Sequence, residues 1–372
     1  MTRDFELNDE QQQLRDAQEK RVLGVAGPGT GKTTVFVRRV CKEIRENADS
    51  DKAVCALTFT NSATDVIRQR LAETGHTACF PNFLGTIDTF LLQHVVQPFA
   101  PVAGIVPDGG VRLLAGDQET HLHQPKCRVN EGHTKASVYK FTFCGGRLEQ
   151  PVFDVSLQGR RPKRVETVWL CKKALETKLR EVWEKHGLMT HSDCAYVAAR
   201  LLKDDDWRDR IAAGFGARFS NLLIDEVQDI GTFRLKALLN LAELSDVDVF
   251  LVGDPDQAIY QFRGATPSQI SDLVEERNFV SYPVPKTYRF GQSICEASEA
   301  FSTQEDRTLR PDEPEPEDRA EMHYHNWRPS EETPFNELLE WLNDELGEDE
   351  DAAVLARKNN TLDYIRYGRE RG

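Results

Sequence analysis

The stretch VLGVAGPGTGKTT, residues 22–34, decides the fold of this chain. It begins with a short apolar run typical of a strand, passes through a glycine-rich turn and ends at Gly-Lys-Thr, where a helix is expected to begin. Glycines let backbone N–H groups approach a polyphosphate closely, and a helix N-terminus adds a positive dipole at the same place. The stretch therefore predicts a phosphate-binding loop between a strand and a helix.

The residue types in this loop suit a magnesium–nucleotide complex, so we predict ATP and Mg²⁺ as cofactors. Lys32 is placed to reach the terminal phosphates, and the Thr33 hydroxyl can ligate the metal. The general Walker pattern is matched everywhere except at its first glycine, where the chain has alanine. The predicted nucleotide-binding residues of the loop are Ala26, Gly27, Pro28, Gly29, Thr30, Gly31, Lys32, Thr33 and Thr34.

Three further apolar runs, at residues 52–59, 221–224 and 247–252, predict neighbouring strands of a parallel sheet. The second run leads directly into Asp225 and Glu226. Asp225 is a predicted Mg²⁺ ligand, and Glu226 is predicted to orient and deprotonate the attacking water. An acidic pair after a strand is also common in solvated turns. Its combination with an upstream phosphate loop favours the catalytic interpretation.

Composition limits the class of protein. The chain has 372 residues, of which 39% are hydrophobic, enough to form two or three domain cores. No apolar run approaches the roughly 18 residues of a membrane span, so we predict a cytoplasmic protein without a membrane partner. The eight cysteines are scattered and are typical of reduced thiols. The net charge of −14 argues against binding a polyanion by overall electrostatics, although residues 159–173 are locally basic.

The central part of the chain has a different character. Prolines and glycines break regularity after residue 91, alternation suggests a hairpin around Cys144–Arg147, and residues 164–202 are helical in composition. We therefore predict an ATP-binding domain at 1–90 and 217–280, an inserted mostly helical domain at 91–216, and the start of a further domain at 281–372. A zinc site is a weaker hypothesis, because the spacing matches no common site; its ligands would be His121, His123, Cys127 and His133.

Taken in order, these motifs resemble those of the UvrD/Rep/PcrA-like superfamily 1 helicases. The phosphate loop of that family characteristically begins with alanine, as at Ala26. The segment 224–229 is similar to the family's Walker B motif, and 286–290 to a motif in which tyrosine stacks on adenine. The resemblance implies an α/β P-loop NTPase fold, with a RecA-like parallel sheet and part of a second RecA-like domain.

The resemblance also assigns roles beyond the phosphate loop. Gln11, whose amide could read an adenine edge, lies in a segment that resembles the family's adenine-reading motif; Gln257 would contact the γ-phosphate as a catalytic group. Tyr288 would stack on adenine, and Arg289 would act as a catalytic cation at the γ-phosphate. The implied DNA-binding residues are Phe59, Thr60, Asn61, Thr86, Tyr260 and Phe262. Asp88 departs from the family, which usually has histidine there.

The implied activity is that of an ATP-dependent helicase or translocase that moves 3′-to-5′ on single-stranded or partly duplex DNA. The family's last two motifs have no counterpart before Gly372. We therefore expect the isolated chain to be poorly active and to need a completing C-terminal half or a partner subunit. An alternative function is an ATP-binding sensor or regulatory subunit of a DNA-repair or phage-defence complex that does not unwind DNA by itself.

Overall fold

The computed structural model describes residues 6–76, 80–114, 126–129, 132–135, 142–144, 147–149, 177, 179–258, 267–304 and 307–312. All of these belong to one compact unit within residues 1–316. A six-stranded sheet forms its centre, and every neighbouring pair of strands in it is parallel. Across the sheet the strands are β12 (Val280–Val284), β1 (Arg21–Ala26), β11 (Asp248–Gly253), β10 (Phe219–Ile224), β2 (Ala53–Thr58) and β3 (Phe83–Thr86).

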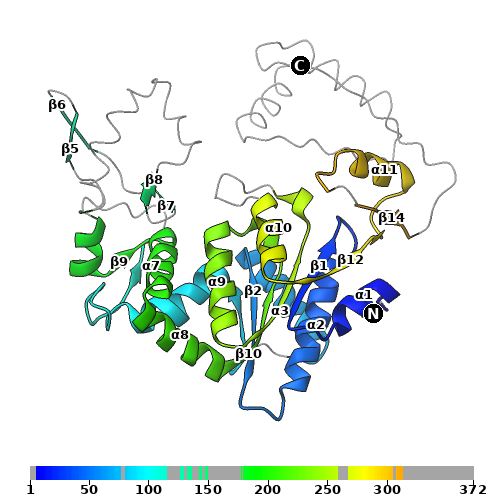
Figure 1. The fold of residues 1–372 in the computed structure, drawn as a ribbon, viewed down its shortest axis with the longest axis horizontal. Helices are drawn as coiled ribbons and strands as arrows, with labels where there is room; N and C mark the ends of the chain where they lie inside the picture. Colours follow the sequence, from blue (N-terminus) through cyan, green and yellow to red (C-terminus); the bar gives the residue numbers. More distant parts are fainter. Residues whose placement is uncertain are drawn as a thin grey trace, which may run out of the picture. The chain divides into compact units, whose positions relative to one another are not determined.

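Side chains alternate between two cores on opposite faces of this sheet. In β10, Leu222 and Ile224 enter one core and Leu223 the other. Both faces of the central strands are thus buried, as parallel sheets require. The predicted α/β P-loop NTPase fold and its strands are confirmed. Helices cover the two faces (Figure 1): α1 (Asp9–Asp16), α2 (Lys32–Glu46) and α3 (Asn61–Glu73) on one, and α9 (Thr232–Leu244) and α10 (Pro267–Glu276) on the other.

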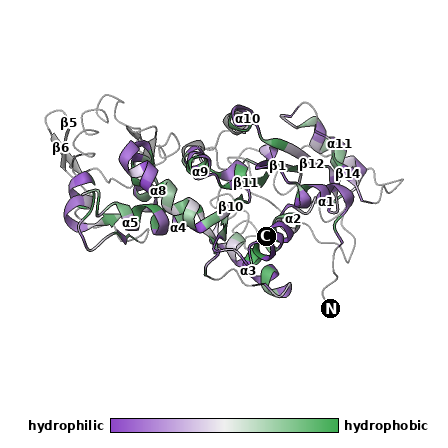
Figure 2. Ribbon diagram, turned by 60° about the horizontal axis from the view of Figure 1, so that its bottom comes forward, coloured by the Kyte–Doolittle hydropathy of each residue, from purple (hydrophilic) through white to green (hydrophobic). Residues whose placement is uncertain are grey.

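The described residues of the predicted insert share the core of the second face. Leu91, Trp183 and Phe215 pack in the same hydrophobic cluster as the sheet residue Leu222. Figure 2 shows hydrophobic colouring that continues from the sheet into this region. Its elements are α4 (Ile87–Phe90), the π-helix η1 (Leu91–Val96), α5 (Gln97–Phe99), β4 (Arg112–Leu113), β9 (Leu188–Met189), α7 (His191–Lys203) and α8 (Asp205–Arg218).

Two local features shape the helices of this region. The Thr86 hydroxyl accepts the Thr89 N–H, and α4 begins at Ile87 directly after β3. The helical stretch expected over 164–202 is interrupted at Gly187, which has a left-handed φ of 62°. A Cβ there would lie 2.3 Å from the carbonyl oxygen of Gly110, so glycine is required where β9 begins.

Two hairpins are described between these elements. The hairpin expected around Cys144–Arg147 is confirmed, because β7 (Thr142–Cys144) and β8 (Arg147–Glu149) pair antiparallel. A second antiparallel pair joins β5 (Lys126–Val129) and β6 (Gly132–Lys135). The zinc hypothesis stays a prediction, since two of its ligands, His121 and His123, lie outside the described residues.

The sheet extends beyond the domain boundary that the sequence suggested at residue 280. Strand β12 pairs in parallel with β1, so the sheet continues to Val284. It is followed by β13 (Lys286–Thr287), α11 (Gln292–Ala300) and β14 (Arg310–Pro311), with β13 and β14 paired in parallel. The domain division itself stays a prediction. None of the helices in the described part of the chain has the length and apolar character that a membrane span needs.

Candidate nucleotide-binding site

The phosphate loop joins β1 to α2 at the carboxyl edge of the sheet. Gly29 and Gly31 have φ angles of 74° and 82°, in the left-handed region that glycine adopts without strain. Gly31 is the N-cap of α2 and provides no side-chain cap. The first N–H groups of a 15-residue helix and its positive dipole therefore face the loop. This arrangement suits a phosphate group.

Lys32 is buried beside the loop that it follows. Its Nζ donates to the carbonyl oxygen of Gly27 at 3.3 Å, and the Thr30 hydroxyl donates to the same oxygen at 2.8 Å. A neutral carbonyl is a weaker partner for an ammonium than an ionised oxygen. A phosphate at this place would offer Lys32 a charged acceptor, which agrees with its predicted role.

The acidic pair follows β10, which β11 separates from β1. Asp225 is 1% exposed; its backbone N–H donates to Leu57, and its Oδ1 accepts the Glu226 N–H at 2.9 Å. Glu226 has a left-handed φ of 52°, and its Oε2 accepts the side-chain N–H of Gln228 at 2.7 Å. A non-glycine residue in that conformation is uncommon and is found often at functional sites.

Electrostatics at Asp225 fit a divalent cation. Burial, and then the neighbouring charge of Glu226, raise the pKa of Asp225 to about 7, against the opposing effect of Lys32. A bound cation would stabilise the ionised carboxylate, and oxygen ligands are those that Mg²⁺ prefers.

The predicted metal ligands Thr33 and Asp225 could hold Mg²⁺, which would supply positive charge beside the phosphates. No cluster of three or more His, Cys, Asp and Glu side chains able to hold a metal occurs in the described part of the chain. Phosphate and water oxygens would therefore have to complete the coordination.

A chain of hydrogen bonds connects the loops after β10 and β11. The Gln228 side-chain oxygen accepts the Asp254 N–H at 3.0 Å, and the Gln257 side-chain N–H donates to Asp254 Oδ2 at 2.6 Å. The acidic pair and the predicted γ-phosphate contact Gln257, which lies in η5 (Pro255–Gln257), are thus joined through buried polar groups. Gln228 was not among the predicted site residues, although a glutamine within an otherwise acidic motif was an available signal.

Residues of β13 and the turn after it contact the phosphate loop. The Thr287 hydroxyl donates to the carbonyl oxygen of Pro28 at 2.9 Å, and the Tyr288 N–H donates to that of Gly29 at 3.0 Å. The Tyr288 ring is 46% exposed, and its hydroxyl accepts an N–H of the Asn8 side chain at 3.0 Å. A Cβ added to Gly29 would lie 2.4 Å from that of Arg289. Tyr288 and Arg289 thus lie against the loop, and their predicted roles stay predictions.

Gln11 is almost fully buried on the other side of the loop. Its side-chain N–H donates to the carbonyl oxygen of Thr30 at 2.8 Å, and its side-chain oxygen accepts the Asn8 N–H at 3.0 Å. Asn8 is the N-cap of α1. Gln11 therefore braces the phosphate loop from α1. Adenine reading by its amide stays a prediction.

Four of the predicted DNA-binding residues lie at two neighbouring strand ends. Phe59 is half-buried after β2, and Asn61 is exposed at the start of α3. The hydroxyls of Thr60 and Thr86 cap α3 and α4 by accepting backbone N–H groups. These two threonines have a structural use, and their DNA contacts stay predictions. The predicted stacking residues Tyr260 and Phe262 lie outside the described residues.

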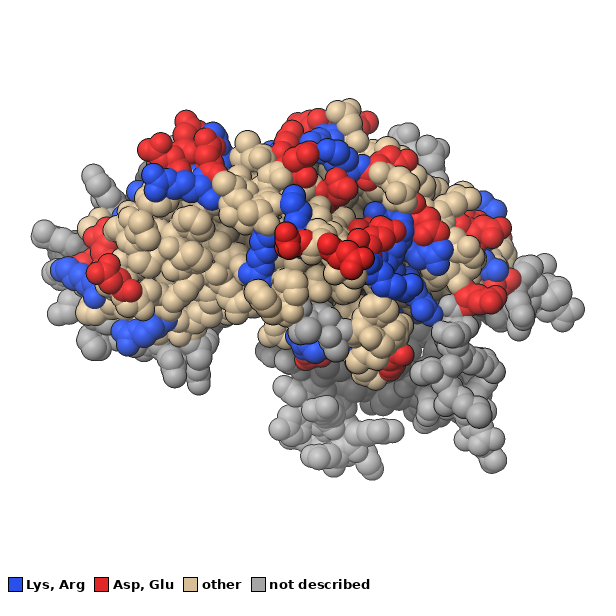
Figure 3. Space-filling model, turned by 90° about the horizontal axis from the view of Figure 1, so that it is seen from below, with Lys and Arg blue, Asp and Glu red and all other residues tan. Residues whose placement is uncertain are grey.

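Asp88, which replaces the family's histidine, has a partner on another helix. Its Oδ1 accepts the Nε–H of Arg234 in α9 at 3.0 Å. The pair joins the helix after β3 to the helix after the acidic loop. On the face shown in Figure 3, Lys and Arg are interleaved with Asp and Glu. Any DNA contact on that face would rest on local groups, in keeping with the acidic net charge.

Comparison with known proteins gives a consistent result. Residues 10–263 match a family model described as an AAA domain. The chain is 24% identical to Gabija protein GajB of Bacillus cereus, over 94% of its own length and 60% of that protein. It is 24% identical to DNA helicase II of Haemophilus influenzae, over 95% of its length and 48% of that protein. The chain is 25% identical to DNA helicase II of Escherichia coli, over 80% of its own length and 39% of that protein. The chain thus spans about half the length of these relatives.

Proposed function

Because this chain belongs to the AAA domain family and is similar to the UvrD-like DNA helicases, we propose that it is the ATP-binding part of an ATP-dependent DNA helicase or translocase. The proposed motor couples ATP hydrolysis to 3′-to-5′ movement on single-stranded DNA in the cytoplasm. A completing C-terminal half or a partner subunit is part of the proposal. The polarity and the DNA substrate rest on the family resemblance.

One observation carries the proposal. Lys32 follows β1 and the pair Asp225 and Glu226 follows β10, at the same edge of one parallel sheet and separated by a single strand. Ligands bind at this edge in open α/β sheets. In the proposed mechanism Lys32 neutralises the phosphates, Asp225 holds Mg²⁺, and Glu226 takes the proton of the attacking water.

The experiment that tests this function is a nucleotide-binding and turnover assay on Lys32→Ala. The variant should lose Mg²⁺-ATP binding or turnover while its thermal unfolding stays close to that of the parent chain. Lys185→Ala is a matched control, since Lys185 is exposed and forms a surface salt bridge with Glu181, one helical turn away. Normal nucleotide affinity and turnover in Lys32→Ala would refute the site.

A second candidate function is an ATP-binding sensor or regulatory subunit. The match to GajB, which covers 94% of this chain, is consistent with it. The two candidates differ in their response to DNA. A motor should hydrolyse ATP faster when single-stranded DNA is added, and it should unwind duplex once its completing half is supplied. A sensor should bind ATP with no unwinding under the same conditions.

A further inference from the structure

Two acidic side chains after β11 share one buried arginine. Arg307 exposes 7% of its side-chain surface. Its Nη1 lies 2.9 Å from Asp254 Oδ1, and its Nη2 lies 3.1 Å from Oδ2 of the same carboxylate, a two-pronged ion pair. Nη1 also contacts Asp256. Three charged groups are thus packed together, with two negative charges and one positive charge.

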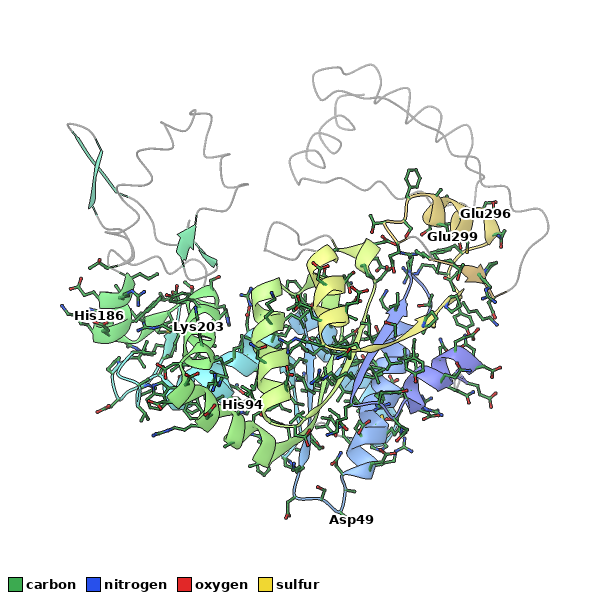
Figure 4. All side chains as sticks on the ribbon, in the orientation of Figure 1. Asp49, His94, His186, Lys203, Glu296 and Glu299 are labelled. Carbon is green, nitrogen blue, oxygen red and sulfur yellow. The ribbon has the colours of Figure 1, made fainter. Side chains whose placement is uncertain are left out.

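This cluster lies directly on the phosphate loop. A Cβ added to Gly27 would lie 3.2 Å from Arg307 Nη2 and 2.5 Å from a methyl group of Leu309. The Leu309 N–H donates to Glu299 on α11, which Figure 4 labels. The segment that carries Arg307 therefore lies against the loop, and its guanidinium occupies space that a side chain at Gly27 would need.

Both carboxylates have further donors, so the arginine is one part of a larger network. Asp254 also accepts the side-chain N–H of Gln257 at 2.6 Å. Asp256 accepts the Ser302 hydroxyl at 2.7 Å and the Thr303 N–H at 2.9 Å. Although burial opposes it, hydrogen bonds from Thr303, Ser302 and Gln304 lower the pKa of Asp256 well below its ordinary value. Asp256 therefore carries its charge at neutral pH.

Negative charge beside a phosphate loop weakens the binding of a polyphosphate, and the last phosphate of a triphosphate adds charge that a diphosphate lacks. Without Arg307, the two carboxylates would repel that phosphate. The predicted γ-phosphate contact, Gln257, is held by one of the same carboxylates. Arg307 therefore neutralises the carboxylate that also holds the predicted γ-phosphate contact.

We propose that Arg307 is a specificity-determining residue: it neutralises Asp254 and Asp256 beside the phosphate loop and so gives the site its preference for nucleoside triphosphate over diphosphate. This inference rests on the proposed nucleotide-binding function. It predicts a selective effect, because a residue that only stabilised the fold would change the affinities for both nucleotides together.

The test compares Arg307→Gln, which removes the charge, with Arg307→Lys, which keeps it. Dissociation constants for Mg²⁺-ADP and for a non-hydrolysable Mg²⁺-ATP analogue are measured on the full chain. Arg307→Gln should weaken binding of the ATP analogue on the order of 10-fold and change ADP binding by less than about 3-fold. Arg307→Lys should keep most of the preference. Adding Asp256→Asn to Arg307→Gln should restore much of the lost affinity.

Arg310→Gln is the matched control, because Arg310 lies on the same segment with an exposed side chain and should have no effect on either nucleotide. Equal losses for ADP and the ATP analogue, or no loss for either, would overturn the inference while the parent chain still binds nucleotide. Failure of the parent chain to bind either nucleotide would overturn the proposed function as well. If Arg307→Gln does not fold, Arg307→Lys decides: retained preference supports the inference, and a lost preference in a folded protein overturns it.

Discussion

Two regions of the same unit are buried in opposite ways. At the carboxyl edge of the sheet, several buried side chains are charged: those of Lys32, Asp225, Asp254 and Arg307. Where the sheet meets α4, η1 and α8, the buried groups are apolar and include a cluster of aromatic rings. Phe90 is fully buried there, with its ring centroid 5.7 Å from that of Phe215 and 5.1 Å from that of His94.

The two kinds of burial indicate different roles, one in function and the other in packing. Burying a charge costs free energy unless it is paired, whereas burying an aromatic ring stabilises the fold directly. A protein selected for stability alone would favour buried aromatic rings over buried charges in both regions. The charged edge is therefore the region where we expect substitutions to alter chemistry, and the aromatic region the one where they alter stability.

The largest expected effect is at the charged edge. Glu226→Gln should lower ATP turnover by about 10² to 10⁴-fold, because an amide cannot take the proton of the attacking water. Nucleotide affinity should stay close to that of the parent chain, since the phosphate loop is unchanged. Turnover and nucleotide binding measured on the same preparation check this. Undiminished turnover would remove Glu226 from the proposed mechanism.

The next effect is on stability. Phe90→Ala should lower the free energy of unfolding by about 3–5 kcal/mol, because it leaves a cavity between α4 and the sheet. Phe80→Ala is the matched control: Phe80 is 83% exposed, so the same substitution should change stability by less than about 1 kcal/mol. Denaturant unfolding of both variants measures the difference. Similar losses in the two variants would contradict the packing account.

A smaller effect concerns DNA. Stacking of one base on an aromatic ring contributes roughly 1–3 kcal/mol, so Phe59→Ala should weaken single-strand binding about 5- to 150-fold if the proposed contact is made. Fluorescence anisotropy with a labelled oligonucleotide measures this, and thermal unfolding serves as its companion. Unchanged DNA affinity together with a lowered melting temperature would show that Phe59 belongs to the core.

The smallest effect is a pH dependence of stability in the aromatic region. Burial, and then the charge of Arg218, lower the pKa of His94 from 6.5 to about 4; Figure 4 labels this side chain. Between pH 6.5 and 4, the His94 imidazole is protonated in the unfolded chain but stays neutral in the folded chain. The contribution of His94 is therefore constant above pH 6.5 and is lost as the pH falls toward 4.

His94→Phe should remove this contribution, which we expect to be about 1 kcal/mol because the ring is partly exposed and screened. Asp193 has a pKa raised to about 6 by burial, which gives the opposite slope. The measured quantity is therefore the difference in melting temperature between variant and parent at pH 7.5 and pH 5. The melting temperature of the variant should rise relative to that of the parent when the pH is lowered to 5. A difference that is the same at both pH values would contradict the assignment.

Local patterns predicted most of the sheet and the phosphate loop. Continuous apolar runs identified β2, β10 and β11, because a parallel strand buried on both faces leaves that signature in its own residues. The loop after β1 was predicted for a similar reason, since its glycines and lysine are adjacent in sequence.

The parts that were missed depend on contacts distant in sequence. Arg307 lies more than fifty residues after Asp254, and nothing in its neighbours shows that it pairs with that carboxylate. Strand β12 carries a proline and exposed residues, so its sequence lacks the apolar run of a central strand even though it pairs with β1. Gly187 could be recognised as a break only with Gly110 in contact with it. Sequence patterns thus predicted which strands are buried, but not which residues distant in sequence contact one another.

The joint between β12 and β13 has a mechanical consequence. Val284 ends one strand and Lys286 begins the next, so a single residue, Pro285, connects the sheet to the segment that lies on the phosphate loop. The proline ring fixes its φ angle, and its carbonyl oxygen accepts the Arg310 N–H at 2.9 Å. The connection between the two strands is therefore short and conformationally restricted. We therefore expect a displacement of Tyr288 to be transmitted to β12 and, through the hydrogen bonds between β12 and β1, into the sheet.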